Sequence, residues 1–436
     1  MKKRIAIGAL VALGLTLAVV ATALGGPRKQ TSAGTLPSSS CGKLQYKGSG
    51  SPKFIIATDL PLQGANRALT TEMGRAVVFE LGLQHWKAGK YTVGYQACDD
   101  STASTGAWDT AKCSANASAY ARDSSVIGVI GTFNSGCAKL IIPVLNRAPG
   151  GSVAMISPAN TYPGLTIGGP GTAPGEPKVY YPTGKRNYAR VVWTDRFQGA
   201  ADAIFSKTYL HLKKPYVLTD GQTYGLGIAT LYRRALTKLG VKTVGFHKWD
   251  PNATSYESVA SAVKSSHADG VFLGGLVCLN GGKVIKDLRA ALGKKFPILV
   301  PDGFVPPSAT FQTSGGTSNG GYMSYAGIPV GQLKGAGAQF VSSFKKANGG
   351  KLPEPYSAYA AQAAQIMLKA IAKSNGTRSS VSKGLFNLKI NDGILGKFSI
   401  DGNGDTSLGI VTFGRLSGPN TKFIKLITPP LSFTKG

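Results

Sequence analysis

Acidic residues are scarce in this chain of 436 residues. It has 20 Asp and Glu against 49 Lys and Arg, so its formal net charge is +29. Apolar residues nevertheless make up 42% of the sequence and charged residues only 16%. Because this apolar fraction is enough to form a buried core, the composition excludes a wholly disordered basic protein. The length, once an N-terminal segment is set aside, predicts two domains.

Histidine and cysteine are also rare, which excludes the common metal-site patterns. The chain has only four His and five Cys, no two His lie four positions apart, and no C-x-x-C motif occurs. We therefore expect no metal site and no cofactor. The odd number of cysteines leaves at least one of them without a partner inside the chain.

Two motifs that suggest nucleotide or calcium binding are incomplete. Gly281-Gly282-Lys283 resembles part of a phosphate-binding loop, but Val277 replaces its first glycine and Val284 its Ser or Thr. Residues 401–405 begin like a calcium loop, whose twelfth position is Thr412 instead of glutamate. We therefore do not expect an enzyme.

A long hydrophobic run occurs only at the N-terminus. Three basic residues at positions 2–4 precede the uncharged run 5–24, which ends in Ala21-Thr22-Ala23. This pattern predicts a signal peptide over residues 1–23 and therefore export. The run is also long enough to span a bilayer, so a retained N-terminal anchor is the alternative. We expect a protein of the periplasm or of the extracellular face of a bacterial membrane.

Residues 24–52 are rich in Gly, Ser, Pro and Thr, and they predict a flexible tether. The tether is basic, because no acidic residue precedes Asp59. An anionic envelope surface attracts such a protein electrostatically, and we hypothesise that it is a partner. For an exported protein this explains the positive charge better than nucleic acid, which we do not expect as a partner.

Short apolar segments alternate with amphipathic ones along the chain. Lys53–Thr58 is rich in strand-forming residues, whereas Met73, Val77 and Leu81 share one face of a helix. Further strands are predicted at 91–96, 126–131, 152–156, 190–193, 215–219, 243–246, 270–274, 297–300, 396–400 and 409–413. Further helices are predicted near 105–121, 137–147, 198–211, 224–238, 254–266, 281–291, 334–347 and 355–373. This alternation is typical of an α/β fold whose mainly parallel sheets are covered by helices on both faces.

Three loops follow predicted strands and precede helices: Gly131–Gly136, Ser157–Thr161 and Thr219–Tyr224. In such sheets, ligands bind beyond the carboxyl ends of the strands. A helix N-terminus with nearby hydroxyl groups suits a carboxylate. Each loop alone is compatible with ordinary helix capping, but their recurrence favours a binding cleft.

These segments together resemble the type I periplasmic solute-binding proteins of ABC transporters, in particular the leucine/isoleucine/valine-binding class. The resemblance rests on Phe54–Gly64, Val126–Gly131, Ile156–Thr161, Tyr224-Gly225 and Pro301-Asp302-Gly303, in the order and near the spacing of that family. It implies two α/β lobes, each a doubly wound sheet, that close on a ligand about three hinge crossings. The crossings are placed near 190–196, 318–330 and 387–395. The first lobe then holds 53–192 and 325–390, and the second holds 193–324 and 391–436.

The resemblance also implies the ligand-binding residues. From the first lobe, a polar shell holds the ligand's α-carboxylate and ammonium; its members are Ser135, Gly136, Ala159, Asn160 and Thr161. From the second lobe, Tyr224 closes over the ligand and Asp302 pairs with its ammonium. The alternative for these residues is helix capping or packing. Leu276 stands where the family has a tyrosine, so we leave the ligand's side chain open.

Cys98 matches the family's first disulfide position, and the resemblance implies a partner near residue 134. We therefore expect Cys98–Cys137, with Cys98–Cys113 as the second choice. Cys278 is expected to be unpaired or bonded to Cys41.

The function implied is that of a monomeric extracytoplasmic receptor, which captures a small amino acid or a related carboxylate or amide. It delivers this ligand to the permease of an ABC transporter. The alternative is a sensory or regulatory module on the same fold that is not coupled to transport.

Overall fold

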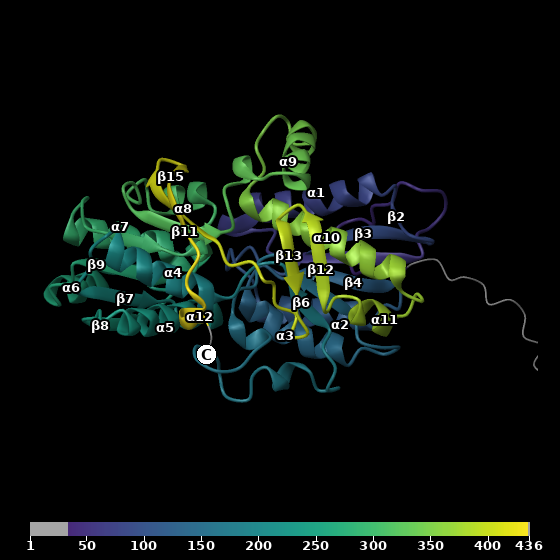
Figure 1. Ribbon diagram of the computed structural model, residues 1–436, viewed down its shortest axis with the longest axis horizontal. Coiled ribbons are helices and arrows are strands. Elements are labelled where there is room, and N and C mark those ends of the chain that lie inside the picture. Colours follow the sequence, from purple (N-terminus) through teal and green to yellow (C-terminus); the bar gives the residue numbers. More distant parts are fainter. Residues whose placement is uncertain (1–33, 435–436) are drawn as a thin grey trace, which may run out of the picture. The chain divides into compact units, whose positions relative to one another are not determined.

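A computed structural model describes residues 34–434, so the predicted signal peptide and residues 24–33 of the predicted tether lie outside the described residues. Strands from two parts of the chain form two separate sheets (Figure 1). The first sheet has the order β2 (Lys87–Ala88), β3 (Tyr91–Asp99), β1 (Phe54–Leu60), β4 (Val126–Gly131), β5 (Ala154–Ser157), β6 (Tyr188–Arg190). Its strands are parallel except for the β2–β3 pair. β1 and β4 are buried along their whole length, as covered parallel strands require.

The second sheet joins parallel strands to an antiparallel edge. Its order is β15 (Asn420–Ile427), β14 (Val411–Ser417), β11 (Tyr322–Ala326), β10 (Ile298–Val300), β9 (Gly270–Gly274), β7 (Pro215–Thr219), β8 (Gly245–Lys248). The strands from β8 to β11 are parallel, whereas β14 and β15 are antiparallel. A two-stranded antiparallel sheet comes from β12 (Leu388–Gly393) and β13 (Gly396–Ile400). The predicted α/β fold with two mainly parallel sheets is confirmed.

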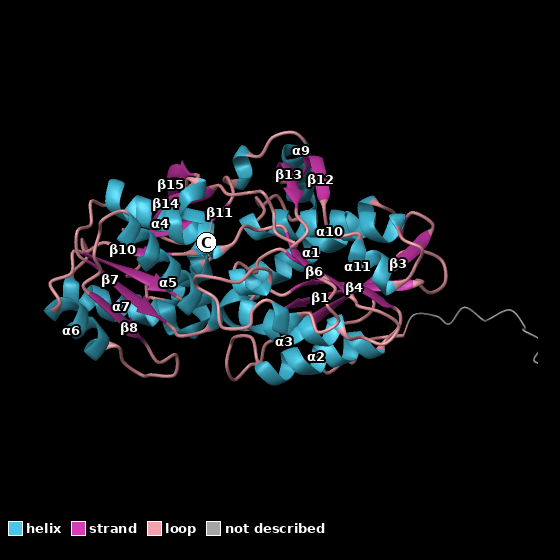
Figure 2. Ribbon diagram, turned by 60° about the horizontal axis from the view of Figure 1, so that its bottom comes forward, coloured by secondary structure: helices cyan, strands magenta, loops and turns pink. Residues whose placement is uncertain are grey.

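Helices cover the sheets (Figure 2). Those packed with the first sheet are α1 (Arg67–Leu83), α2 (Thr110–Arg122), α3 (Ser135–Asn146), α9 (Ala336–Ala347), α10 (Pro355–Lys373) and α11 (Arg378–Lys383). Those packed with the second are α4 (Asp195–Thr208), α5 (Thr223–Lys238), α6 (Glu257–Ser265), α7 (Gly282–Leu292), α8 (Pro307–Thr313) and α12 (Leu431–Thr434). Within residues 34–434, no helix has both the length and the hydrophobicity needed to cross a membrane.

The chain passes between the two sheets three times. It leaves the first sheet after β6, returns after β11 to form α9 and α10, and enters the second sheet again at β14. Residues 387–395, where we expected the third crossing, instead belong to the β12–β13 hairpin. That hairpin is held by α10, because Gln362 Oε1 accepts a hydrogen bond from Leu395 N at 3.2 Å. The third crossing therefore comes after Ile400.

Residues 34–52 are held against β3, so the expectation of a flexible tether is wrong for this stretch. Gln45 and Tyr95 exchange two backbone hydrogen bonds of 2.8 and 2.9 Å. Leu36 is buried, and its N–H donates to Gln96 Oε1 at 2.9 Å. The segment thereby pairs with an edge of β3 that would otherwise be open.

The cysteines pair differently from our expectation. Cys41 is bonded to Cys98 and Cys113 to Cys137, while Cys278 is free. The expected Cys98–Cys137 bond is wrong because the N-terminal segment brings Cys41 beside Cys98. The second choice, Cys98–Cys113, is wrong because α2 packs against α3 and carries Cys113 to Cys137.

Loss of either disulfide should destabilise the fold. Replacing Cys113 and Cys137 together by Ser opens a loop with a sequence separation of 24 residues, which we expect to lower the free energy of unfolding by about 3 kcal/mol. Thermal unfolding checks this, with Cys278→Ser as the control that leaves the melting temperature nearly unchanged. Equal effects of the two changes would contradict the observed pairing.

Glu80 is a buried carboxylate between α1 and α10. It is 2% exposed, and Gln365 Nε2 donates to it at 3.1 Å. Burial raises the pKa of Glu80 to about 7, an effect that this hydrogen bond partly opposes. The folded-state pKa of Glu80 lies above the unfolded value of 4.5, so the folded state favours the protonated carboxyl group. The contribution of this group to the free energy of unfolding is therefore complete below pH 4.5 and is lost as the pH rises through 7.

Glu80→Gln should therefore be more stable than the parent at high pH. Glutamine keeps the shape and accepts the same hydrogen bond but carries no charge, so we expect a gain of about 2–3 kcal/mol at pH 8. At pH 4.5 the two proteins should unfold at nearly the same temperature. Melting curves at both pH values test this, and a gain that does not depend on pH would contradict the buried charge.

Candidate functional site

A cavity lies where the carboxyl ends of strands from both sheets meet. Its lining comes from the loops after β4, β5, β9 and β10 and from the first turns of α3, α5 and α10. The lining residues are Phe133, Asn134, Ser135, Ala159, Thr161, Tyr224, Leu276, Asp302, Gly303 and Tyr356. Both sheets therefore contribute to one site, as expected for doubly wound folds.

The structure brings together six of the eight predicted residues. Ser135, Ala159, Thr161, Tyr224, Leu276 and Asp302 all line the cavity. The other two, Gly136 and Asn160, are close in sequence to lining residues but are not part of the lining.

Gly136 and Asn160 support the loops instead. A side chain at Gly136 would approach the Trp108 ring to 2.4 Å, so only glycine fits there. The buried Asn160 amide donates from Nδ2 to the carbonyl of Phe133 at 3.0 Å and to Thr132 Oγ1 at 3.2 Å. Asn160 thereby fixes the loop after β4 to the loop after β5.

Ser157 reinforces this connection. Its hydroxyl donates to the Thr132 carbonyl at 2.9 Å and accepts from the N–H groups of Ala159 and Asn160 at 3.0 and 2.8 Å. The loop that carries Ala159 and Thr161 is therefore rigidly placed beside the start of α3. At that start, the first N–H groups of the helix have no partner within the helix and carry a partial positive charge.

Asp302 is the only charged residue in the cavity lining and is 5% exposed. The Tyr224 hydroxyl donates to its Oδ1 at 2.5 Å, and the Tyr356 hydroxyl donates to its Oδ2. Burial raises the pKa of Asp302, while the two phenol hydrogen bonds oppose this shift. No Lys or Arg lines the cavity, so the lining supplies no cation to pair with this carboxylate.

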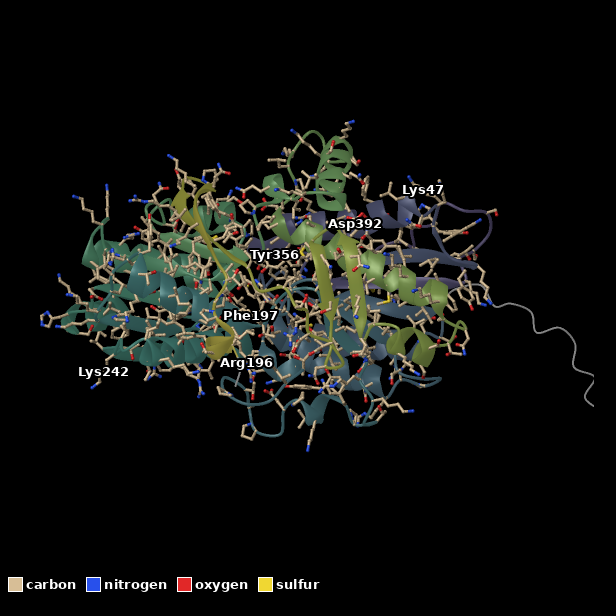
Figure 3. The ribbon with its side chains drawn as sticks, viewed as in Figure 1. Lys47, Arg196, Phe197, Lys242, Tyr356 and Asp392 are labelled. Atoms are coloured by element: carbon tan, nitrogen blue, oxygen red, sulfur yellow. A yellow bond between two sulfur atoms is a disulfide. The ribbon has the colours of Figure 1, made fainter. Side chains whose placement is uncertain are left out.

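The two phenols come from different parts of the chain. Tyr224 lies in the first turn of α5, and the Gly303 N–H donates to its hydroxyl at 3.1 Å. Tyr356 lies at the start of α10, which packs against α1 and β4 (Figure 3). The Asp302–Tyr356 hydrogen bond therefore connects the second sheet to helices of the first. Burial, and then the negative charge of Asp302, raise the pKa of both phenols well above the ordinary value, so both remain hydrogen-bond donors at neutral pH.

Four further residues line the cavity that the sequence patterns did not indicate: Phe133, Asn134, Gly303 and Tyr356. Phe133 and Asn134 lie in the predicted loop 131–136, and Gly303 adjoins Asp302, so position alone could have indicated these three. No sequence pattern placed Tyr356 near the cavity, because it lies in a helix 54 residues after Asp302. Its ring contacts Phe133, with 5.8 Å between the ring centroids, and so completes one wall of the cavity.

Asp195 is a second buried acid beside the site. Its N–H donates to the Thr161 carbonyl at 2.8 Å. Neither oxygen of its carboxylate has a hydrogen-bond partner among residues 34–434. Burial raises the pKa of Asp195 well above the ordinary value, and the charge of Asp302 adds to this shift.

Comparison with known proteins agrees with this arrangement. An amino acid binding protein of Pseudomonas aeruginosa is 26% identical over 56% of this chain and 59% of its own length. This chain thus matches less than two thirds of that relative. A leucine-binding protein, LivK, of Thermotoga maritima superposes with a TM-score of 0.71 at 22% identity, covering 86% of this chain and 99% of the other.

A branched-chain amino acid transporter substrate-binding protein, LivJ, of Streptococcus pneumoniae also superposes with a TM-score of 0.71, at 18% identity. It covers 86% of this chain and 99% of the other. At these identities, the two superpositions show the two-lobe fold. The family model described as periplasmic binding protein matches residues 73–414, which include every residue that lines the cavity. The chain therefore belongs to the periplasmic binding protein family and has the two-lobe type I fold of its leucine/isoleucine/valine-binding class.

Proposed function

We propose that this protein is an extracytoplasmic receptor that binds a small amino acid, or a related carboxylate or amide, between its lobes. The observation that supports this most strongly is Asp302, a buried carboxylate with no cationic partner in the cavity lining. A buried charge is stable only when it is paired or well hydrogen-bonded. A ligand ammonium supplies the missing positive charge.

The opposite wall suits the other end of an amino acid. The α3 N-terminus at Ser135 offers N–H groups and a partial positive charge, and Thr161 adds a hydroxyl. Because these groups belong to the first lobe and Asp302 to the second, a zwitterion contacts both lobes at once. Such a ligand stabilises the closed arrangement in preference to an open one.

The remaining walls are largely apolar. Phe133, Leu276 and the Tyr356 ring surround the space between the polar groups. Leu276 in place of a tyrosine makes this wall apolar, which favours an aliphatic side chain.

The relatives support the ligand class and suggest the partner. The Pseudomonas aeruginosa relative is called an amino acid binding protein, and the Streptococcus pneumoniae structure contains isoleucine. The latter protein is also described as a transporter substrate-binding protein. We infer that this chain acts outside the cytoplasm as a monomer and delivers its ligand to the permease of an ABC transporter.

Asp302→Asn tests the ammonium contact. The change keeps the shape of the side chain but removes its charge, so amino acids should bind at least about 100-fold more weakly, as expected for loss of one partner of a buried charge pair. Titration calorimetry with the amino acid that most raises the melting temperature of the parent measures this. Asp392→Asn, at an exposed position of β12, is the matched control and should bind like the parent.

An unchanged affinity in Asp302→Asn would show that Asp302 does not contact an ammonium. If no amino acid stabilises the parent but simple carboxylates or amides do, the ligand belongs to the related classes. In that case the role of Asp302 in binding an ammonium is wrong, while the receptor function stands.

A further inference from the structure

A second cavity lies in the second lobe, between α4, α5 and the C-terminal α12. Three basic residues line it, Arg196, Arg234 and Lys238, and no acidic residue does. Arg196 is labelled in Figure 3, where it lies beside α12. None of these residues belongs to the candidate ligand site.

The packing of the helices brings the three cations together. Arg196 lies in the first turn of α4, which packs along α5. Arg234 and Lys238 are four residues apart on α5 and so share one face of that helix. Lys238 Nζ donates to the Ser432 carbonyl at 2.9 Å and lies 5.8 Å from the centroid of the Phe433 ring. The C-terminal segment therefore holds Lys238 at the border of the cavity.

None of these three cations forms an ion pair with a carboxylate of residues 34–434. Within residues 34–434, the only ion pairs are those of Lys139 and Arg190. Arg196 Nη2 donates to the Gly168 carbonyl at 2.7 Å, but its buried Nε has no acceptor in this part of the chain. Burial lowers the pKa of Arg196; the charge of Asp405 opposes this shift and that of Arg234 adds to it. A partly buried guanidinium next to another cation is stabilised by an anion.

The charge of the rest of the surface also favours the binding of an anion. Nine of the 20 acidic residues are buried, but only three of the basic residues that the structure describes are. The exposed surface is therefore even more cationic than the net charge of +29 indicates. Anions are attracted to the whole molecule, and three of its cations line this one cavity.

We propose that this cavity binds a phosphate group. Two guanidinium groups and an ammonium match the several oxygens of a phosphate better than the two of a carboxylate. Leu231, Ala235 and Phe433 provide apolar walls for the organic part of a phosphate ester. The phosphate comes from a soluble phosphate compound or from the headgroup of an anionic lipid.

The test compares Arg234→Gln with Lys242→Gln in the full chain. Both positions are exposed and both changes remove one positive charge, but Lys242 lies outside the cavity. Inorganic phosphate is titrated by calorimetry, and vesicles of phosphatidylglycerol with phosphatidylcholine are tested by sedimentation, with pure phosphatidylcholine as the blank. An ionic strength of about 0.15 M screens remote surface charges. We expect Arg234→Gln to weaken binding by about tenfold, as expected for loss of a charge-assisted contact, and Lys242→Gln to leave it unchanged.

Inorganic phosphate and phosphatidylglycerol vesicles distinguish a soluble phosphate ligand from a lipid headgroup. Saturable binding of inorganic phosphate that is weakened only by Arg234→Gln supports a soluble phosphate ligand. Binding confined to phosphatidylglycerol vesicles, and weakened only by Arg234→Gln, supports a lipid headgroup. The proposal is overturned if neither probe binds, or if the two variants lose binding equally, because equal loss indicates general attraction to a basic surface.

Discussion

The site depends on one buried carboxylate without a cation beside it. Asp302 is held by the phenols of Tyr224 and Tyr356, which come from helices packed on different sheets. Neutral phenols satisfy the carboxylate by hydrogen bonding but do not neutralise its charge. The cavity therefore keeps a negative potential, and the Asp302 carboxylate also connects the two lobes of the protein. Recognition of a positive ligand group and contact between the lobes thus involve a single side chain.

The opposite wall is built from backbone and hydroxyl groups and contains no cation. Ser157 and Asn160 join the loops after β4 and β5, which fixes Thr161 beside the first turn of α3. Fixed dipoles of this kind stabilise a carboxylate without reorganisation when the ligand arrives. The two walls are complementary to the two ends of a zwitterion, and the apolar wall between them contacts its side chain.

Much of this arrangement follows from local sequence patterns. Continuous apolar runs identify β1 and β4, and the loops that follow strands contain most of the lining, because the carboxyl ends of parallel strands share one edge of a sheet. Local patterns do not predict contacts between segments that are distant in the sequence. Tyr356 reaches the cavity through the return of α10 to the first sheet, and Cys41 reaches Cys98 through pairing of residues 34–52 with β3. The third crossing comes after residues 387–395, because the β12–β13 hairpin stays with α10.

The most direct test of the central claim is a crystal structure of the protein with a bound amino acid. The account predicts the ammonium within about 3 Å of an Asp302 oxygen and the carboxylate at the α3 N-terminus near Ser135 and Thr161. A ligand bound in the reverse orientation, or bound outside the cavity, would contradict it.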